Sequence, residues 1–415
     1  MPPAPPASPA QGLSPGQHRT IRVHLALIPA YVWLFYVWPV FFAQLPVRPT
    51  ADQPHLVRDF FHFYVVGTIT REHDAHALYD IDAMAAVAER VLPGVPKNIF
   101  PPVYGPQVGL LFAPFSELDY LSALYVWLAL TLVGTGVCVY LVWRSSEVRR
   151  FPWPVAVFAL GLPGLHFALS FGQTSVLGLA CFTALWLALK RGHHVAAGVA
   201  VGALAYKPQL GLVVACVFIL RREWRVVGGA VLAIAAQCLA AWAYWGTSIF
   251  EAYARAIPRY LSLFGAMEPD AQLAYSMRAV LLGLHLEPRW AVAASVSLSV
   301  VVIGLAVAAW RHEVPIDLRY VGLVFATLLI DPHLYGYDLL LAAPALLLAG
   351  DRVWRRRDQI GVLCVTALYG APILTMLLPG PSVLTTLALV AVTGWTIGQS
   401  VLKIPVETPD KSASH

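Results

Sequence analysis

The sequence predicts an all-α integral membrane protein with about twelve transmembrane helices. Of its 415 residues, 58% are hydrophobic and only 12% are charged, which is about half the charged fraction of an ordinary soluble domain. The mean hydropathy is +0.67, and about a dozen apolar runs approach the roughly 20 residues that cross a bilayer as a helix. The net charge of +5 therefore relates to membrane orientation, and we expect no nucleic-acid partner.

The apolar runs define the order of the elements and the predicted domain limits. The first run is too long for a signal peptide and lacks a small-residue cleavage site, so we expect a retained helix. Residues 1–22, rich in Pro and Ala, are predicted to be a disordered N-terminus, residues 23–403 the transmembrane domain and residues 404–415 a tail. The predicted spans are 23–45, 120–143, 152–171, 174–190, 194–206, 208–220, 226–245, 290–310, 317–330, 338–349, 360–378 and 382–402.

The distribution of basic residues predicts the orientation. Alternate loops and both termini together hold 18 of the 28 Lys and Arg residues. Because loops rich in Lys and Arg stay in the cytoplasm, we expect these loops and both termini on the cytoplasmic side of the cell membrane. Two long loops, 46–119 and 246–289, then lie outside. Residues 104–115 are apolar but too short to span, and we expect a re-entrant or surface-lying segment.

Familiar cofactor and metal motifs are absent from the sequence. The five cysteines all lie in apolar runs without a CxxC pair, so we interpret them as packing residues. There is no GxGxxG, P-loop lysine, GxSxG or HExxH motif. We therefore expect neither a cofactor nor a metal ion.

Polar residues near the membrane converge on one face. The topology places Asp59, Gln173, Lys207 and the segment 331–338 on the extracytoplasmic side. Charged groups near hydrocarbon are costly and persist mainly where they bind or react. A set of distant residues gathered at one face therefore predicts a functional site.

Each member of this set has a functional and a structural interpretation. Asp59 lies among aromatic residues, where desolvation makes a carboxylate a better general base, but it equally suits a helix cap. Gln173 can bind a sugar hydroxyl or a phosphate, or cap a helix. Lys207 precedes Pro208, which breaks the helix and leaves a point charge suited to phosphate; the alternative is a snorkelling side chain.

The segment 331–338 is the densest polar patch between two apolar runs, and its Pro and Gly predict a shaped loop. We expect His333 to donate a hydrogen bond to a phosphate or to help position an acceptor. We expect Tyr335 and Tyr337 to bind the sugar, because each offers an apolar face and a hydroxyl. The full set of sugar-binding or acceptor-binding candidates is Gln173, His62, Tyr64, Tyr335, Tyr337 and Asp338. Arg255 and Arg259 in the second outer loop are further phosphate-binding candidates.

Four stretches resemble the glycosyltransferase 87 family in sequence and order. They are DFFHFYVVGTITREHDAHALYD, FPPVYGPQVGLLFAPF, the run from GQTSVLGLACF to AYKPQLGL, and DPHLYGYDLLLAAPALLL. The family includes polyprenol-phosphate-mannose-dependent mannosyltransferases with the GT-C fold. The resemblance implies a GT-C-like helical bundle, a polyprenyl-phosphate sugar donor and an extracytoplasmic site. It also implies that Asp59 is the base and that His333 and Lys207 belong to the site, whereas Asp331 stands where the family often has Ser.

We therefore expect an inverting glycosyltransferase that moves a sugar, mannose by resemblance, to a hydroxyl of an envelope lipid or glycan. The expected partners are the lipid-linked donor, the acceptor and membrane lipids. A transporter or flippase of a lipid-linked sugar is the alternative, although such proteins place charges near the midplane and often contain repeats. A non-catalytic subunit would tolerate substitution of the outer-loop residues.

Overall fold

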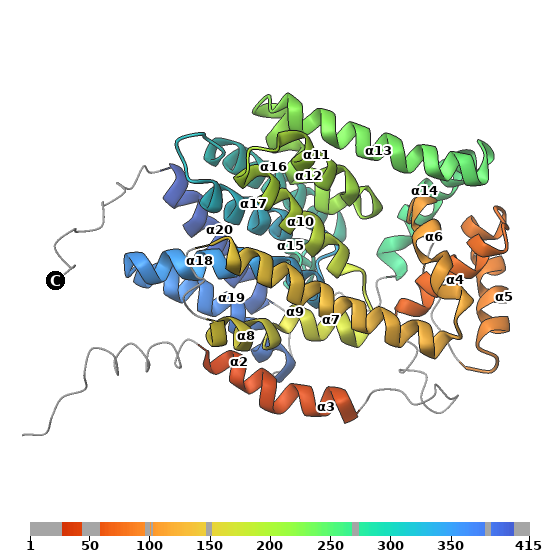
Figure 1. Ribbon diagram of the computed structural model, residues 1–415, viewed down its shortest axis with the longest axis horizontal. Helices are drawn as coiled ribbons and strands as arrows, with labels where there is room; N and C mark the ends of the chain where they lie inside the picture. Colours follow the sequence, from red (N-terminus) through yellow and green to blue (C-terminus); the bar gives the residue numbers. More distant parts are fainter. Residues whose placement is uncertain are drawn as a thin grey trace, which may run out of the picture.

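The computed structural model describes residues 27–43, 59–95, 100, 103–146, 152–267, 274–377 and 383–401, and these residues form helices without a strand. The predicted disordered N-terminus and the C-terminal tail lie outside the described residues. Long helices run side by side through the bundle, and a layer of shorter helices lies at one end (Figure 1).

Every predicted span overlaps one or more helical elements. The elements are α2 (Ile28–Val32), η1 (Trp33–Val37), α3 (Trp38–Ala43), α7 (Tyr120–Arg144), α8 (Pro152–Leu160), α9 (Pro163–Phe171), α10 (Ser175–Lys190), α11 (His194–Ala203), η6 (Leu204–Tyr206), α12 (Pro208–Leu220), α13 (Trp224–Trp245), α16 (Pro288–Ala309), α17 (Ile316–Ile330), η8 (Gly336–Leu341), α18 (Ala342–Arg356), α19 (Gln359–Leu377) and α20 (Val383–Val401). The predicted span 152–171 is divided into α8 and α9, because Pro163 begins a new helix.

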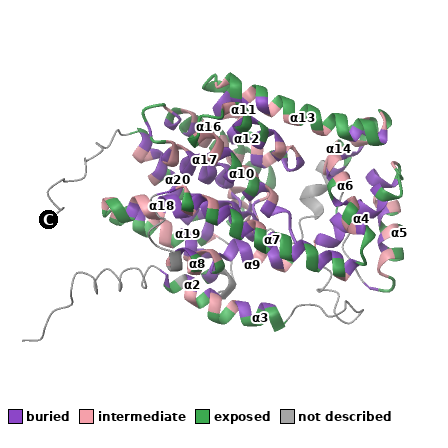
Figure 2. Cartoon of the chain, viewed as in Figure 1, coloured by how far each residue is buried: buried purple, intermediate pink, exposed green. Residues whose placement is uncertain are grey.

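Five helical segments of the described chain are long and apolar enough to cross a membrane: Tyr120–Arg144, Pro154–Phe171, Trp224–Trp245, Pro288–Ala309 and Val383–Val401. Leu232 on α13 and Val300 on α16 each leave 64% of their surface exposed, and Figure 2 shows exposed residues along α13. Apolar helices with an exposed apolar surface are typical of proteins surrounded by lipid. The other spans rest on shorter helices, such as α11 with 10 residues, so the number twelve stays a prediction.

The described residues of the first loop that is predicted to lie outside form a compact helical layer. It contains α4 (Phe60–Arg71), η3 (Ala77–Tyr79), α5 (Ile81–Val91), α6 (Gln107–Phe112) and η4 (Ala113–Glu117). A side chain on Gly67 would collide with the Phe112 carbonyl, and one on Gly109 would collide with Thr70. These two glycines therefore let α6 pack directly on α4. With six residues, α6 is about 9 Å long and does not form a spanning helix.

The second outer loop joins the same layer. It forms α14 (Ser248–Met267) and α15 (Met277–Gly283). The Tyr260 hydroxyl donates to the Tyr79 carbonyl at 3.1 Å, and the Tyr244 hydroxyl at the end of α13 donates to the Thr70 carbonyl at 2.7 Å. The first of these bonds connects the two loops that the sequence places on one side of the membrane, and the second joins the end of α13 to the same layer.

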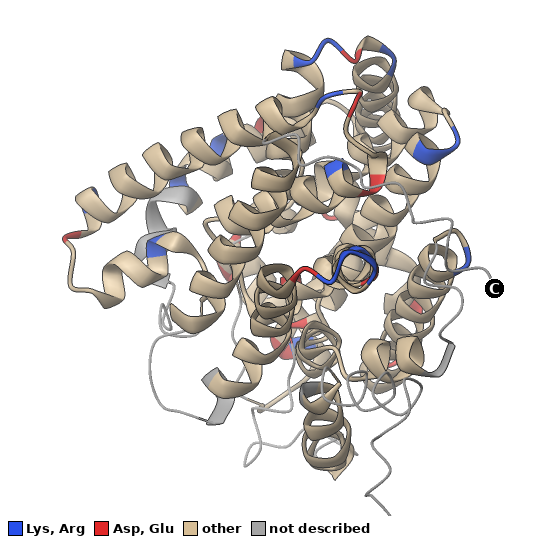
Figure 3. Ribbon diagram, turned by 90° about the vertical axis from the view of Figure 1, so that its left-hand side faces the viewer, with Lys and Arg blue, Asp and Glu red and all other residues tan. Residues whose placement is uncertain are grey.

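The polar site and the basic loops lie at opposite ends of the bundle. Gln173 precedes the first residue of α10, and Lys190 is its last residue, so about 24 Å separate the ends of this helix. Basic residues also end α7 and α18. In Figure 3, which views the basic end, blue segments mark the loops nearest the viewer.

Candidate active site

Asp59 lies at the start of α4, where it contacts the turn between α9 and α10. The Gln173 side chain donates from Nε2 to Asp59 Oδ2 at 2.8 Å. Gly172 makes this approach possible, because its φ of +65° ends α9 in a left-handed conformation. A side chain on Gly172 would lie 2.7 Å from Cβ of Phe60. Trp127 on α7 donates to the Gly172 carbonyl at 3.0 Å, so the turn is held from both sides.

The surroundings of Asp59 suit a proton acceptor. Burial raises the pKa of Asp59 to about 6, whereas the hydrogen bond from Gln173 and the nearby His333 act in the opposite direction. A carboxylate with this pKa is ionised at neutral pH and still more basic than an exposed aspartate. The side chain does not cap α4 by a hydrogen bond, so the structure gives no support to the capping interpretation.

Lys207 forms a buried ion pair with Asp338. Its Nζ lies 2.6 Å from Asp338 Oδ1, and the two side chains are 4% and 0% exposed. Ser175, the first residue of α10, donates to the same oxygen at 3.0 Å. Burial lowers the pKa of Lys207, but the Asp338 and Asp331 carboxylates outweigh burial and raise it overall. The ammonium therefore stays charged in the interior.

The loop after α17 brings a second carboxylate beside Lys207. Asp331 Oδ1 accepts the backbone N–H of His333 at 2.9 Å, and its buried Oδ2 has no hydrogen-bond partner among the described residues. Burial raises the pKa of Asp331 to about 6; Lys207 lowers it and Asp338 raises it. The predicted loop shape is confirmed, since the backbone is non-helical between α17 and η8.

Three aromatic rings follow one another along this loop. The His333 and Tyr335 rings are 4.7 Å apart, and Tyr335 stacks on Tyr337 at 5.6 Å. Lys207 Nζ lies 5.3 Å from the Tyr337 ring centre. His333 thus lies between the Asp59 side and the Asp331 side of the cluster.

Four predicted site residues lie elsewhere or have other contacts. His62 is buried near Tyr104 and Phe100, and burial lowers its pKa to about 4, so it is neutral at pH 7. The Tyr64 hydroxyl donates to the Leu118 carbonyl at 2.6 Å. Arg255 and Arg259 are exposed on α14, and Arg259 acts on Asp80. The phosphate-binding role of these arginines stays a prediction.

Sequence reasoning missed Tyr104 and Ser175. Tyr104 precedes α6, its ring lies 5.2 Å from that of Phe63, and its carbonyl accepts the Tyr79 hydroxyl at 3.1 Å. Burial raises the Tyr104 pKa to about 12, and all the site carboxylates and Lys207 act on its hydroxyl. The only available signal was an aromatic residue before a Gly-Pro pair. Ser175 gave no signal beyond its place next to the Gln173 turn.

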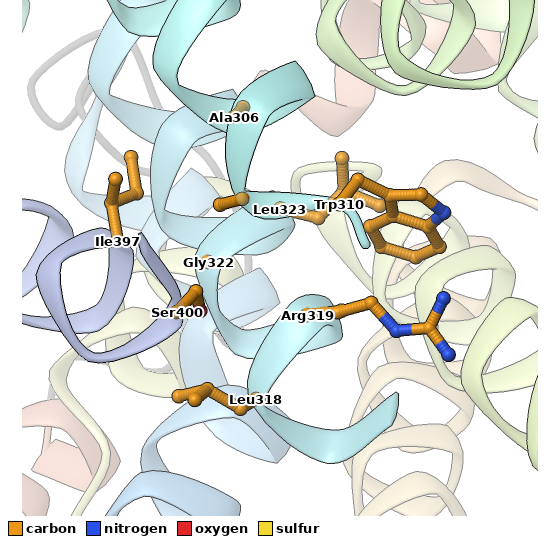
Figure 4. A pocket seen from close by; sticks show the side chains of 9 residues that line it. Ala306, Trp310, Leu318, Arg319, Gly322, Leu323, Ile397 and Ser400 are labelled. Carbon is orange, nitrogen blue, oxygen red and sulfur yellow. The ribbon is translucent and has the colours of Figure 1, made fainter. Parts of the chain in front are cut away.

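Two pockets of the described structure lie at the basic end. One, with room for about one water molecule (about 10 Å³), is lined by Trp310, Arg319 and Ser400 among others (Figure 4). A wider recess of about 420 Å³ is lined by His193, His194 and Arg225. Neither contains a candidate site residue. The candidate site is therefore defined by the chemistry of the Asp59–Asp338 cluster.

A bundle of apolar helices with a buried acid–base cluster at one end defines a membrane-embedded enzyme. The family model for Glycosyltransferase family 87 matches residues 103–332, and the chain belongs to this family. The matched region includes Gln173, Lys207 and Asp331; His333 directly follows it, whereas Asp59 lies well before it. No curated protein and no solved structure matches the chain significantly. Family membership favours a glycosyltransferase over the alternative of a transporter.

Proposed function

We propose that the enzyme transfers a sugar from a polyprenyl-phosphate donor to an acceptor hydroxyl, with inversion, at the Asp59–Asp338 cluster. The observation that carries the proposal is the convergence of a partly buried, ionised carboxylate and a buried, charged ammonium at one end of the bundle. A glycosyl transfer of this kind needs a base for the acceptor and positive charge for the departing phosphate.

In the proposed reaction, Asp59 takes the proton of the acceptor hydroxyl as that oxygen attacks the anomeric carbon. The bond between this carbon and the phosphate oxygen breaks, and the lipid phosphate leaves with the bonding electron pair. Gln173 keeps the Asp59 carboxylate oriented through its 2.8 Å hydrogen bond. Lys207 and His333 stabilise the negative charge that develops on the phosphate oxygen.

Lys207 suits this role because its hydrogen-bonding capacity is not exhausted. An ammonium has three N–H donors, and within the described part of the chain one of them has a hydrogen-bond acceptor, Asp338. Buried donors usually find partners, so the remaining two favour a ligand oxygen. The ring of Tyr335 supplies an apolar face for the sugar.

We place the acceptor on the side of His62 and Tyr104. Both ring nitrogens of His62 are buried and have no partner among the described residues, and the residue lies on the first turn of the helix that begins after Asp59. We propose that the whole site lies on the extracytoplasmic face. We propose that the transferred sugar is mannose. The position of the basic loops at the opposite end supports this side.

The test is a transfer assay with purified protein in lipid. Radiolabelled polyprenyl-phosphate-mannose is the donor, a crude membrane-lipid extract supplies acceptors, and nucleotide-linked mannose is the comparison donor. We expect label in a new lipid or glycan with the wild type and not with Asp59→Asn. Transfer from the nucleotide donor alone would refute the proposed donor class, and transfer by Asp59→Asn at the wild-type rate would refute the proposed base.

A further inference from the structure

The ion pair between Lys207 and Asp338 joins three separate elements. Lys207 precedes α12, Asp338 lies in η8, and Ser175 begins α10. Asp338 Oδ1 accepts both the Lys207 ammonium at 2.6 Å and the Ser175 hydroxyl at 3.0 Å. One carboxylate oxygen is thus fixed by two donors from different helices.

Stability does not account for this arrangement. Removing two charges from water is costly, and well-packed apolar side chains in place of a buried pair often stabilise a protein as well or better. The pair is costly to form and needs another explanation. Ionic groups retained in the interior are characteristic of sites that bind or react.

Asp338 is poorly placed to bind a sugar itself. Its side chain has no exposed surface, and its second oxygen is buried without a partner among the described residues. On its first oxygen, Lys207 and Ser175 already occupy the acceptor positions. A ligand would have to displace one of them to reach this oxygen, and the second oxygen is closed to solvent because the side chain has no exposed surface.

We infer that Asp338 and Ser175 are positioning residues that hold the Lys207 ammonium ready for the donor phosphate. The inference rests on the proposed function of Lys207. A lysine has a long, flexible stem, and a group that is ordered before binding loses less conformational freedom on binding. The Tyr337 ring, whose centre lies 5.3 Å from Nζ, further restricts the position of the ammonium. Asp338 and Ser175 thus act on the donor only through Lys207.

A double-mutant cycle tests this indirect action. Lys207→Met, Asp338→Asn and the double variant are assembled in lipid nanodiscs, and the dissociation constants of polyprenyl monophosphate and polyprenyl-phosphate-mannose are measured. We expect Asp338→Asn to weaken binding about tenfold, the typical effect of a hydrogen bond to a charged group. The double variant should bind no more weakly than Lys207→Met, because residues that act through one another are not additive.

Two further variants keep the test decisive if Asp338→Asn does not fold. Ser175→Ala removes one hydrogen bond and leaves the ion pair, and we expect it to weaken lipid-phosphate binding about fivefold in the wild-type background and not at all in Lys207→Met. The double variant should recover the melting temperature lost in the single variants, because no charge is left unpaired, without recovering donor binding. Lys190→Met with Asp317→Asn, a partly exposed pair at the basic end, is the matched control and should bind like the wild type.

The outcomes separate the inference from the proposed function. Additive effects of Lys207→Met and Asp338→Asn would mean that Asp338 contacts the donor itself, and recovery of donor binding in the double variant would mean that the pair only supports the fold. Either result overturns the inference alone. Unchanged binding of both lipids by Lys207→Met would remove Lys207 from the phosphate site and the inference with it, while loss of transfer in Asp59→Asn would still support the transferase and its base.

Discussion

Asp59 combines burial with a strong hydrogen bond, and its ionisation should control the rate. We expect Asp59→Asn to reduce transfer by about 10²- to 10⁴-fold, the usual contribution of a general base. The variant should keep the fold, because an asparagine oxygen can still accept the 2.8 Å hydrogen bond from Gln173. Initial rates with labelled donor check this, and Asp74→Asn, which changes an exposed turn in the outer layer, is the matched control.

The pH dependence of the rate follows from the same carboxyl. With a pKa of about 6, Asp59 is protonated at pH 5 and ionised at pH 7, so kcat/KM should rise over this interval and level off above it. Asp331 also has a pKa of about 6. Asp331→Asn should therefore leave the midpoint of the rate profile in place. If the midpoint disappears in Asp331→Asn, the ionisation that controls the rate belongs to Asp331 and not to Asp59.

The raised pKa also has a cost in stability. A carboxyl whose pKa rises on folding stabilises the native state below its ordinary value of 3.8 and loses that contribution as the pH rises through about 6. Removing the Asp59 charge should therefore raise the stability of the native state at neutral pH. We expect Asp59→Asn to be more stable than the wild type by up to about 3 kcal/mol at pH 8, with the difference vanishing near pH 3, below the ordinary value of 3.8. Thermal unfolding at both pH values measures it, and a pH-independent difference would contradict the pKa.

At the scale of elements, the turn between α9 and α10 sets the distance from Gln173 to Asp59. Gly172→Ala should cost about 1 kcal/mol for the left-handed backbone and more for the collision with Phe60, and it should also reduce transfer because Gln173 is displaced. Gly192 has a similar φ of +75° with no atom close to its missing side chain. Gly192→Ala should therefore show the backbone cost in thermal unfolding without a loss of transfer.

Sequence reasoning predicted the helical elements well and the contacts between them less well. Counting spans was sufficient to place Asp59, Gln173, Lys207 and the loop 331–338 at one end, because the direction of each helix follows from the order of apolar runs. The partner of Lys207 was not predictable. Its choice of Asp338 depends on how α10, α12 and η8 pack, which periodicity does not encode. For the same reason, Tyr104 and Ser175 were missed.

The lengths of the elements were also harder to predict than their positions. The predicted span 338–349 contains only part of the 3₁₀-helix η8 and about half of α18. Gly164 explains this departure, because a side chain there would collide with the backbone at Leu340. The close contact of α9 with η8 therefore replaces a regular helix by a tighter one, and a tertiary constraint of this kind leaves no local pattern.

At the scale of the whole molecule, the orientation in the membrane is testable with cysteine labelling. In a variant without its five native cysteines, Glu117→Cys in the outer layer should react with an impermeant maleimide added outside intact cells. Arg191→Cys at the basic end should react only after the membrane is opened. Both positions are exposed. The reverse pattern would place the site in the cytoplasm and would contradict the proposed lipid-linked donor on the outer face.

The contacts of the site also bear on how the protein is made. Its hydrogen bonds join residues 114, 131 and 163 positions apart in the chain. About four fifths of the sequence precedes Asp338. During synthesis, Lys207 enters the membrane region long before its counter-ion has left the ribosome. A nascent chain must shelter this ammonium until η8 arrives, by contact with water, lipid phosphate or the insertion machinery. Assembly of the catalytic cluster is thus a late event in biogenesis, and chains that terminate before residue 331 would insert their helices without acquiring a site.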